Sequence, residues 1–529
     1  MLFKCNETKK FIKEHEIPTN KRLLIWEMGG FTEILRIDLM LATAMRFRGY
    51  KPYVVVCDGF CEACIQRGLE LNQTMNQWPS RCRNCRNRMY RMAKRWNAET
   101  LKINDYVKKG ELKQLKEISL KIDWREIQSY KYLNVQVGRF AFHSINRYMR
   151  GCITEVEDLK DEGIEIYRRY FFASLAMTLL ADRITDRLKP DAFLGSHGVY
   201  TDYAPARCIS FGRGIPTTIC GGGYKERHQY FCSPTNKDKL LLQSMADESW
   251  EKLKVIELNE AENKQLDDYF HNRYFKKESL DISVVESHFS NEELRKKLHI
   301  TNKNIACLFC HIGWDACFDD STIVFDDAYQ WVIESLKVMI ETPEIDWIIR
   351  VHPAENDSRT VCGTVKMLEK HFSLSSLPSN IRILNYDSDV NSYDLFQLID
   401  CGITALGTVG VELPCLGKPV IAAGKGHFSE KGFTYDCNSQ DEYLKLLKSI
   451  ADIPPLSKTQ IELARRYAYI YFIRRQIPLR FIKREEGHWG NIDMAYIQDL
   501  LPGKSSLVEK ICDGISNGTN VIMDEIEFI

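Results

Sequence analysis

The chain alternates between short apolar runs and longer amphipathic stretches, which predicts strands followed by helices. Lys21–Met28 and Tyr53–Val56 are compact apolar runs typical of buried strands, and Thr32–Arg48 between them carries apolar residues at helical spacing. Two more strands are predicted at Pro190–Gly195 and Gly214–Cys220. Strands that alternate with helices favour a parallel sheet, so the first half predicts a Rossmann-like α/β domain.

The second half repeats this pattern, with strands at Asn304–Phe309 and Trp347–Val351 and an amphipathic helix at 327–342 between them. At 529 residues the chain is too long for one ordinary domain. We therefore expect an α/β fold of two Rossmann-like domains that face a cleft. The predicted boundaries are 1–230 for the first domain, 231–300 for a polar helical connection, 301–455 for the second domain, and 456–529 for C-terminal helices that cross back to the first domain.

The stretch from Asp400 to Asp436 has the strongest local signal for a ligand. Its first apolar run ends at Gly407, a helix start follows at Thr408, and a second turn leads into a β-branched strand. A glycine turn before a helix offers backbone N–H groups and a positive helix end to a phosphate. The stretch predicts a nucleotide half-site, with Glu412 within reach of a sugar hydroxyl.

Other candidate residues also follow predicted strands, at the edge where open α/β sheets bind ligands. In the first half these are Gly29-Gly30 and His197. A tight strand–helix turn is the alternative for the glycines, and a helix cap or core residue is the alternative for the histidine. In the second half Pro353 ends a strand, so His352 and Glu355 project at its end.

Five cysteines gather directly after the second predicted strand, in a segment at about 57–95 that reads as an insertion in the first domain. Two CxxC pairs separated by seventeen residues match zinc-site spacing, because each pair supplies two thiolates on one turn. We expect a structural zinc, with an iron–sulfur cluster and metal-free buried thiols as the alternatives. The candidate ligands are Cys57, Cys61, Cys64, Cys82 and Cys85.

Composition narrows the classes of function. Basic and acidic residues balance at 72 each, so no net charge attracts nucleic acid or a membrane. The polar amino terminus lacks a signal-peptide pattern, and no apolar window is long enough to span a bilayer, so we expect a cytoplasmic protein with reduced cysteines. Gly424-Lys425-Gly426 lacks the spacing of a Walker A motif, which disfavours an ATPase.

Five motifs occur in the second half in a fixed order. They are Gly313-Trp314-Asp315, Arg350–Glu355, Gly407–Glu412, Gly417–Val420, and Gly424–His427 with Gly432–Thr434. Together they resemble the bacterial capsule polysaccharide biosynthesis family, which includes the Kdo transferases of capsule export systems. The resemblance covers about 304–436 well and the first half only in outline. Gly407 departs from the pattern, because a Ser-Thr pair is common where this chain has Gly-Thr.

The resemblance implies a GT-B-type glycosyltransferase that uses a nucleotide sugar, often a CMP-linked ulosonic acid. The sugar would pass to a growing capsule or surface polysaccharide, or to its lipid-linked precursor, with no cofactor required for the chemistry. Membrane-associated polysaccharide assembly machinery would be a partner, which would place the protein at the inner face of the cytoplasmic membrane. Alternatives are a nucleotide-sugar epimerase, a polyol-phosphate transferase, and a non-catalytic, metal-stapled scaffold of an assembly complex.

The resemblance also implies roles for residues that carry charge or hydroxyl groups. A transferase needs a general base or a nucleophilic carboxylate. Asp315 is the first candidate, with Glu27 and Asp202 behind it, although Asp315 fits a capping role equally well. His352 and Glu355 would lie between the nucleotide phosphate and the acceptor, and a salt bridge is the alternative for Glu355.

The donor phosphate would lie at the turn before the predicted helix at Thr408. Thr408 and the N–H groups of Val409 and Gly410 would hold the phosphate, and Glu412 would hold the ribose or base. Positive charge stabilises a leaving phosphate as its negative charge develops. Three side chains would supply it: Lys418, Lys425 and His427.

Overall fold

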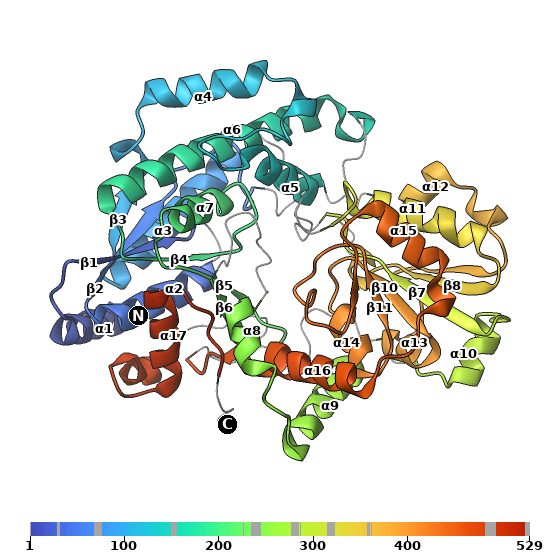
Figure 1. Cartoon of the computed structure of the whole chain (residues 1–529). Coiled ribbons are helices and arrows are strands. Elements are labelled where there is room, and N and C mark those ends of the chain that lie inside the picture. Colours follow the sequence, from blue (N-terminus) through green and yellow to red (C-terminus); the bar gives the residue numbers. More distant parts are fainter. Residues whose placement is uncertain are drawn as a thin grey trace.

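The computed structural model describes residues 2–28, 32–67, 77–149, 156–225, 227–233, 245–276, 285, 287–314, 323–356, 360, 362–481 and 494–523. Two bodies lie side by side in it, each built on a largely parallel sheet with helices on both faces (Figure 1). The predicted α/β class with two Rossmann-like domains is confirmed. Three predicted site residues, Gly29, Gly30 and Asp315, lie outside the described residues.

The first sheet has seven strands in the order β13-β6-β5-β4-β1-β2-β3. The five strands from β5 to β3 are parallel, whereas β6 pairs antiparallel with β5 and β13 pairs antiparallel with β6. The strands are β1 (Lys21–Trp26), β2 (Tyr50–Val56), β3 (Glu99–Lys102), β4 (Ala192–Ser196), β5 (Thr217–Gly222), β6 (His228–Cys232) and β13 (Ile477–Pro478).

Both faces of this sheet are covered, as parallel sheets require. Because side chains alternate along a strand, Leu24 and Trp26 of β1 enter one core, while Leu23 and Ile25 enter the core on the other face. The covering helices are α1 (Leu2–His15), α2 (Thr32–Arg46), α3 (Trp78–Arg95), α4 (Lys109–Lys121), α5 (Val137–Met149), α6 (Val156–Leu188), α7 (Ala204–Gly212) and α17 (Ser506–Asn517).

The second sheet has six parallel strands in the order β12-β11-β10-β7-β8-β9. They are β7 (Asn304–Phe309), β8 (Ile345–Arg350), β9 (Ile381–Leu384), β10 (Cys401–Thr404), β11 (Val420–Ala422) and β12 (Tyr435–Asp436). The helices of this body are α10 (Asn291–Lys297), α11 (Ala328–Glu341), α12 (Thr364–His371), α13 (Ser392–Leu398), α14 (Val409–Cys415) and α15 (Gln440–Lys448).

Three helices join the two bodies along one side of the molecule (Figure 1). They share a buried, largely aromatic core with the loop that follows β11. The last of them continues into a single π-helical turn at Ile470–Arg474, after which β13 adds to the first sheet. The three helices are α8 (Asp247–Leu253), α9 (Glu260–Phe275) and α16 (Lys458–Tyr469).

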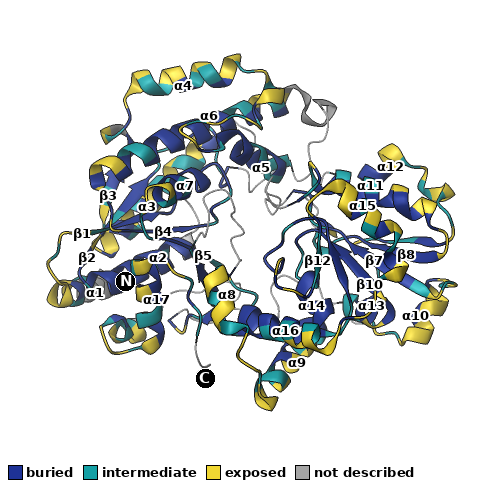
Figure 2. Ribbon diagram, in the orientation of Figure 1, coloured by how far each residue is buried: buried dark blue, intermediate teal, exposed yellow. Residues whose placement is uncertain are grey.

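Short 3₁₀ segments complete the described elements, at Ile103–Asp105, Trp124–Glu126, Pro353–Asn356, Leu374–Ser376, Ile450–Asp452 and Met494–Leu500. Figure 2 shows both sheets buried, with exposure concentrated on the outer faces of helices such as α4 and α10. No helix in the described ranges is long and apolar enough to cross a membrane.

Candidate active site

The carboxyl ends of the two sheets face each other, and one arginine touches both sides. Arg147, in the last turn of α5, lies over the Tyr200 ring and over the Trp314 ring, each at 5.4 Å from its guanidinium. It also donates a hydrogen bond of 3.1 Å to the Tyr200 hydroxyl. Tyr200 follows β4 of the first sheet and Trp314 follows β7 of the second, so this contact spans the two bodies.

His197 lies at the carboxyl end of β4 with a left-handed backbone. Its φ of 55° is costly for a residue with a side chain, so the surrounding structure must hold it there. The imidazole Nδ1 lies 3.0 Å from Oγ of Ser196, the last residue of the strand. Its ring is tilted against Tyr203 at a centroid distance of 5.2 Å. The predicted histidine is therefore held at the sheet edge by its neighbours, which keep its backbone in this strained conformation.

Three buried carboxyls lie behind His197 in the first domain. Glu27 accepts hydrogen bonds from the Ser196 hydroxyl at 2.5 Å and the Tyr203 hydroxyl at 3.0 Å. Burial, and then the charge of Asp38, raise the pKa of Glu27 well above its usual range. Burial likewise raises the pKa of Asp38 and of Asp202 to about 7. Glu27 and Asp202 are 0% and 1% exposed, so neither carboxyl is open to a substrate.

His352 occupies the corresponding edge of the second sheet, directly after β8. Its Nδ1 accepts a hydrogen bond of 3.1 Å from the backbone N–H of Ala354, which places the proton of the neutral ring on Nε2. The His311 ring, after β7, lies nearly parallel to it at 6.5 Å. The turn at Gly407 approaches the same place, because a Cβ there would lie 4.0 Å from Nε2 of His311 and 2.9 Å from Oγ1 of Thr404.

The predicted phosphate role of the turn before α14 depends on its backbone N–H groups. Within the described residues, the N–H groups of Thr408 and Val409 make no hydrogen bond. The N–H of Gly410 donates to the Gly407 carbonyl at 3.0 Å and is engaged within the turn, and its role in holding the phosphate stays a prediction. Gly410 instead makes room for a ring, since a Cβ on it would lie 2.2 Å from the Phe428 ring.

Glu412 is bonded within the protein through both carboxylate oxygens. Oε1 accepts from Nε of Arg273 at 2.9 Å, and Oε2 accepts from the Tyr274 hydroxyl at 2.5 Å. The Arg273 guanidinium in turn lies 5.1 Å from the Tyr224 ring and 5.4 Å from the Phe472 ring. Because Glu412 is only 2% exposed, its carboxylate joins α14 to α9 rather than facing the open edge of the sheet.

Glu355 is also engaged inside the second domain. It is 5% exposed and accepts hydrogen bonds from the backbone N–H of Thr364 at 2.9 Å and from its hydroxyl at 2.6 Å. Burial raises the pKa of Glu355. The carboxyl therefore holds the first turn of α12, and the salt bridge considered from the sequence is not what engages it.

The three side chains predicted to supply positive charge lie in different surroundings. His427 is buried, stacks on Tyr471 at 4.1 Å and 5°, and has its pKa lowered to about 3, mainly by burial, so it is neutral at physiological pH. Lys418 precedes β11 and lies at the amino edge of the sheet, opposite the candidate site. Lys425 follows β11 at the carboxyl edge and pairs with Glu430 at 2.5 Å.

The five predicted metal ligands line one small cavity of about 30 Å³, next to Asp202. Two N–H groups of Arg67 donate to the Cys82 sulfur at 3.1 and 2.8 Å. Hydrogen bonds, first from the Cys61 thiol, lower the pKa of Cys57 to about 7. No three His, Cys, Asp or Glu side chains in the described ranges are grouped closely enough to hold a metal ion. The arrangement thus gathers the thiols without forming a ligand set, and zinc stays a prediction from spacing.

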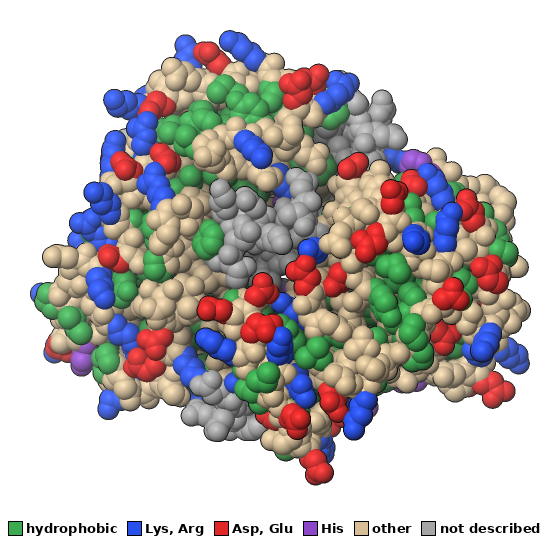
Figure 3. All heavy atoms as spheres, viewed as in Figure 1, with side chains coloured by type: hydrophobic (Ala, Val, Ile, Leu, Met, Phe, Trp, Pro, Cys, Tyr) green, Lys and Arg blue, Asp and Glu red, His purple; other side chains and the backbone are tan. Residues whose placement is uncertain are grey.

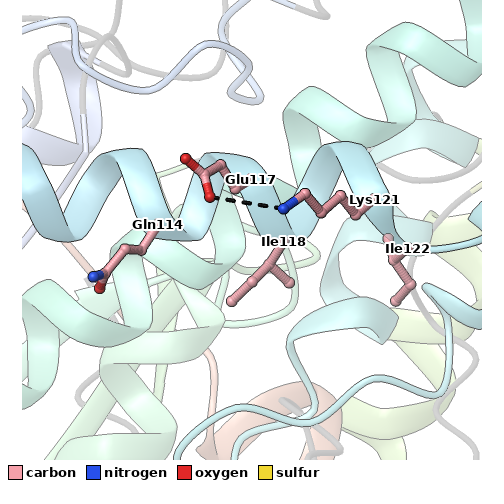
Figure 4. A pocket seen from close by; sticks show the side chains of 5 residues that line it. All are labelled: Gln114, Glu117, Ile118, Lys121 and Ile122. Atoms are coloured by element: carbon pink, nitrogen blue, oxygen red, sulfur yellow. Dashed lines mark ion pairs between the residues drawn. The ribbon is translucent and has the colours of Figure 1, made fainter.

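Another hollow lies on the outer helix α4, away from the carboxyl edges of both sheets. Figure 4 shows its lining residues along one face of the helix, with Glu117 and Lys121 paired at 3.9 Å. Basic and acidic side chains are interspersed over the face of the molecule seen in Figure 3. Neither the hollow on α4 nor these interspersed charges indicate a catalytic site, whereas the facing sheet edges do.

No protein-family model matches the chain, and no curated protein sequence matches it. Similar solved structures include the β-Kdo 2,4 transferase KpsC of Thermosulfurimonas dismutans, with 14% identity over 59% of this chain and 87% of that chain, and a TM-score of 0.34. The β-Kdo 2,7 transferase KpsC of the same organism has 12% identity over 66% and 90%, and a TM-score of 0.32.

A UDP-GlcNAc 2-epimerase from Neisseria meningitidis, bound to UDP-GlcNAc, has 10% identity over 84% of this chain and 98% of that chain, and a TM-score of 0.27. The similar structures thus include Kdo transferases, the class of enzyme in the family that the sequence resembles, and an epimerase. These identities and TM-scores are too low to transfer an activity or a site residue to this chain.

Proposed function

We propose that the protein is a GT-B-type glycosyltransferase that moves a sugar from a nucleotide-sugar donor to a glycan or lipid-linked acceptor. The contact of Arg147 with Tyr200 and Trp314 carries this proposal. It brings the carboxyl edges of two parallel sheets together, and such edges are where open α/β sheets bind ligands. One edge can then hold the donor while the other presents the acceptor.

In this proposal the second domain binds the donor. The donor phosphate lies against the N–H groups of Thr408 and Val409. Lys425 neutralises the charge of the leaving phosphate, and His352 donates a hydrogen bond to it. Glu412 supports this turn from behind, through Arg273. A CMP-linked ulosonic acid is the donor class that the sequence resemblance favours.

The first domain supplies the base in this scheme. His197 takes the proton of the acceptor hydroxyl, which makes the oxygen nucleophilic towards the anomeric carbon. We propose that the carboxylate of Asp315, one residue beyond Trp314, lies at the reacting centre. None of these steps needs a metal. The acceptor is a capsule or surface polysaccharide or its lipid-linked precursor, which places the protein in the cytoplasm beside membrane-bound assembly machinery.

The test is nucleotide release by the purified full chain from CMP- and UDP-linked sugars, with and without acceptor. We expect CMP or UDP to appear only when an acceptor is present, together with an acceptor that has gained the mass of one sugar. Release without acceptor and with an isomerised sugar would identify an epimerase instead. Lack of binding to every nucleotide sugar tested would overturn both enzyme assignments.

Two histidine variants separate the roles of the domains. His197→Gln should lower turnover by about 10²-fold or more, because general-base catalysis is lost, while nucleotide-sugar affinity stays within about twofold. His371→Gln, at the exposed end of α12, is the matched control and should behave as the wild type. Loss of donor binding in His197→Gln would contradict the proposal that the first domain supplies the base and the second domain binds the donor.

A further inference from the structure

A continuous hydrogen-bond chain leads from the base proposed above into the core of the first domain. Nδ1 of His197 lies 3.0 Å from Oγ of Ser196, and that hydroxyl lies 2.5 Å from Oε2 of Glu27. The three groups come from the ends of β4 and β1, which are adjacent parallel strands. Ser196 is 1% exposed and Glu27 is 0% exposed, so bulk water does not enter the chain at these two groups.

A serine hydroxyl carries one proton, so the chain has two proton arrangements. When Glu27 is a carboxylate, the Ser196 proton points to it, Nδ1 of His197 donates to Ser196, and Nε2 carries a lone pair. When Glu27 is protonated, it donates to Ser196, Ser196 donates to Nδ1, and Nε2 carries the proton. The first arrangement makes His197 a base at Nε2 and the second makes it an acid.

We propose that Ser196 and Glu27 form a proton relay behind His197. As Nε2 takes the proton from the acceptor hydroxyl, the Nδ1 proton moves to Oγ of Ser196 and the Ser196 proton moves to Oε2 of Glu27. One proton enters and one reaches the carboxylate, so the imidazole ends neutral. Ser196 and Glu27 are thus positioning residues that act through His197, and their catalytic use rests on the proposed transferase function.

The surroundings of Glu27 favour its protonated form, so His197 is a base at Nε2 only above the pH at which Glu27 loses its proton. Burial raises the pKa of this carboxyl, and the negative charges of Asp38 on α2 and Asp202 after β4 add to the effect. The Ser196 and Tyr203 hydroxyls act in the opposite direction, because they donate to the carboxylate. Cys220 of β5 also lies beside these carboxyls and donates to Asp38 at 3.4 Å.

The first test needs no substrate. In the full chain labelled with ¹⁵N-histidine, the His197 signals are those lost in His197→Gln, and their shifts give the tautomer. Above the pH at which Glu27 loses its proton, we expect the Nδ1–H form in the wild type and in Ser196→Thr. Ser196→Ala removes the bridging hydroxyl and should shift His197 to a mixture of tautomers. An unchanged tautomer in Ser196→Ala would overturn the relay, whether or not the protein has transferase activity.

The second test measures turnover with the donor identified by nucleotide release. Ser196→Ala should lower kcat by about 10²-fold with the donor KM within about twofold, and Ser196→Thr should recover most of the loss. Ser174→Ala, which removes another fully buried hydroxyl on α6, is the control for packing and should keep the wild-type kcat and tautomer. A wild type with the expected tautomer but no nucleotide-sugar turnover would overturn the proposed function and confine the relay to a structural role.

Discussion

Arg273 and Glu412 form an ion pair from which solvent is almost fully excluded, with side-chain exposures of 1% and 3%. A buried pair of this kind adds little compared with an apolar pair of the same shape, but removing one partner leaves the other charge unpaired in the core. Glu412→Gln should therefore lower the free energy of unfolding by about 3–5 kcal/mol, measured by denaturant titration.

The matched control lies on the same helix as Arg273. Lys264 and Asp268 pair at 3.0 Å with exposures of 75% and 63%, so water already solvates both groups. Asp268→Asn should leave the unfolding curve unchanged within error. Equal effects of the two substitutions would show that burial of the Arg273–Glu412 pair has no energetic consequence.

Asp38 gives a prediction about pH. Its pKa is raised from 3.8 to about 7, so the folded chain binds this proton more tightly than the unfolded chain does. The resulting stabilisation is present below pH 4 and is lost as the pH rises through about 7. Asp38→Asn does not titrate, so its melting temperature relative to that of the wild type should rise by several degrees between pH 4.5 and pH 8. Asp513→Asn, on the exposed side of α17, should keep the wild-type dependence.

The sequence predicted which candidate residues follow the strands, but not which residues form hydrogen bonds or ion pairs with one another. His197 and His352 follow apolar strands, so their position at a sheet edge could be read from local pattern. The bond from Ser196 to Glu27 joins residues 169 positions apart, and that from Arg273 to Glu412 joins residues 139 apart. Such pairs, and the burial that neutralises His427, depend on tertiary packing that a single sequence does not display.

At the scale of elements, long apolar strands were predictable and short edge strands were not. Only one of the four residues of β3 is buried, so it leaves no apolar run, and β13 spans only Ile477–Pro478. β6 pairs antiparallel at the outer side of β5 and crosses the boundary predicted at 230 between the first domain and the helical connection. Residues 234–244 of the predicted helical connection lie outside the described residues.

The cysteine-rich insertion after β2 leads to a prediction about bound zinc. Cys57, Cys61 and Cys64 follow β2, whereas Cys82 and Cys85 lie within one turn of α3, so a shared ion would tie these two elements together. Full chain purified without chelator should contain about one zinc per molecule by elemental analysis. Protein with neither zinc nor iron would show that the spacing serves thiol packing around the Arg67 guanidinium instead.

For the whole molecule, the sequence predicted a class of architecture with two sheets, but not how the two sheets are placed relative to each other. Two runs of alternating strands and helices predict two parallel sheets, and a helical connection predicts that they stay attached. Which edges face each other depends on contacts such as Arg147 with Trp314, between residues far apart in the chain. The return of the chain to the first sheet through β13, and the pairing of Arg48 with Glu509 of α17 at 2.7 Å, depend on similarly distant partners.

The Arg147 contact yields a prediction about the two bodies together. A cation over an aromatic ring contributes about 0.5–2 kcal/mol, enough to bias how closely two domains approach without deciding whether either folds. Arg147→Ala should leave the melting temperature nearly unchanged but increase the radius of gyration in solution scattering and alter the Trp314 emission, defined as the signal lost in Trp314→Phe. Arg125→Ala is the control, because Arg125 lies 4.7 Å from the ring of the adjacent Trp124 within one body. If Arg125→Ala expands the molecule as much as Arg147→Ala does, the contact between Arg147 and Trp314 does not hold the sheet edges together.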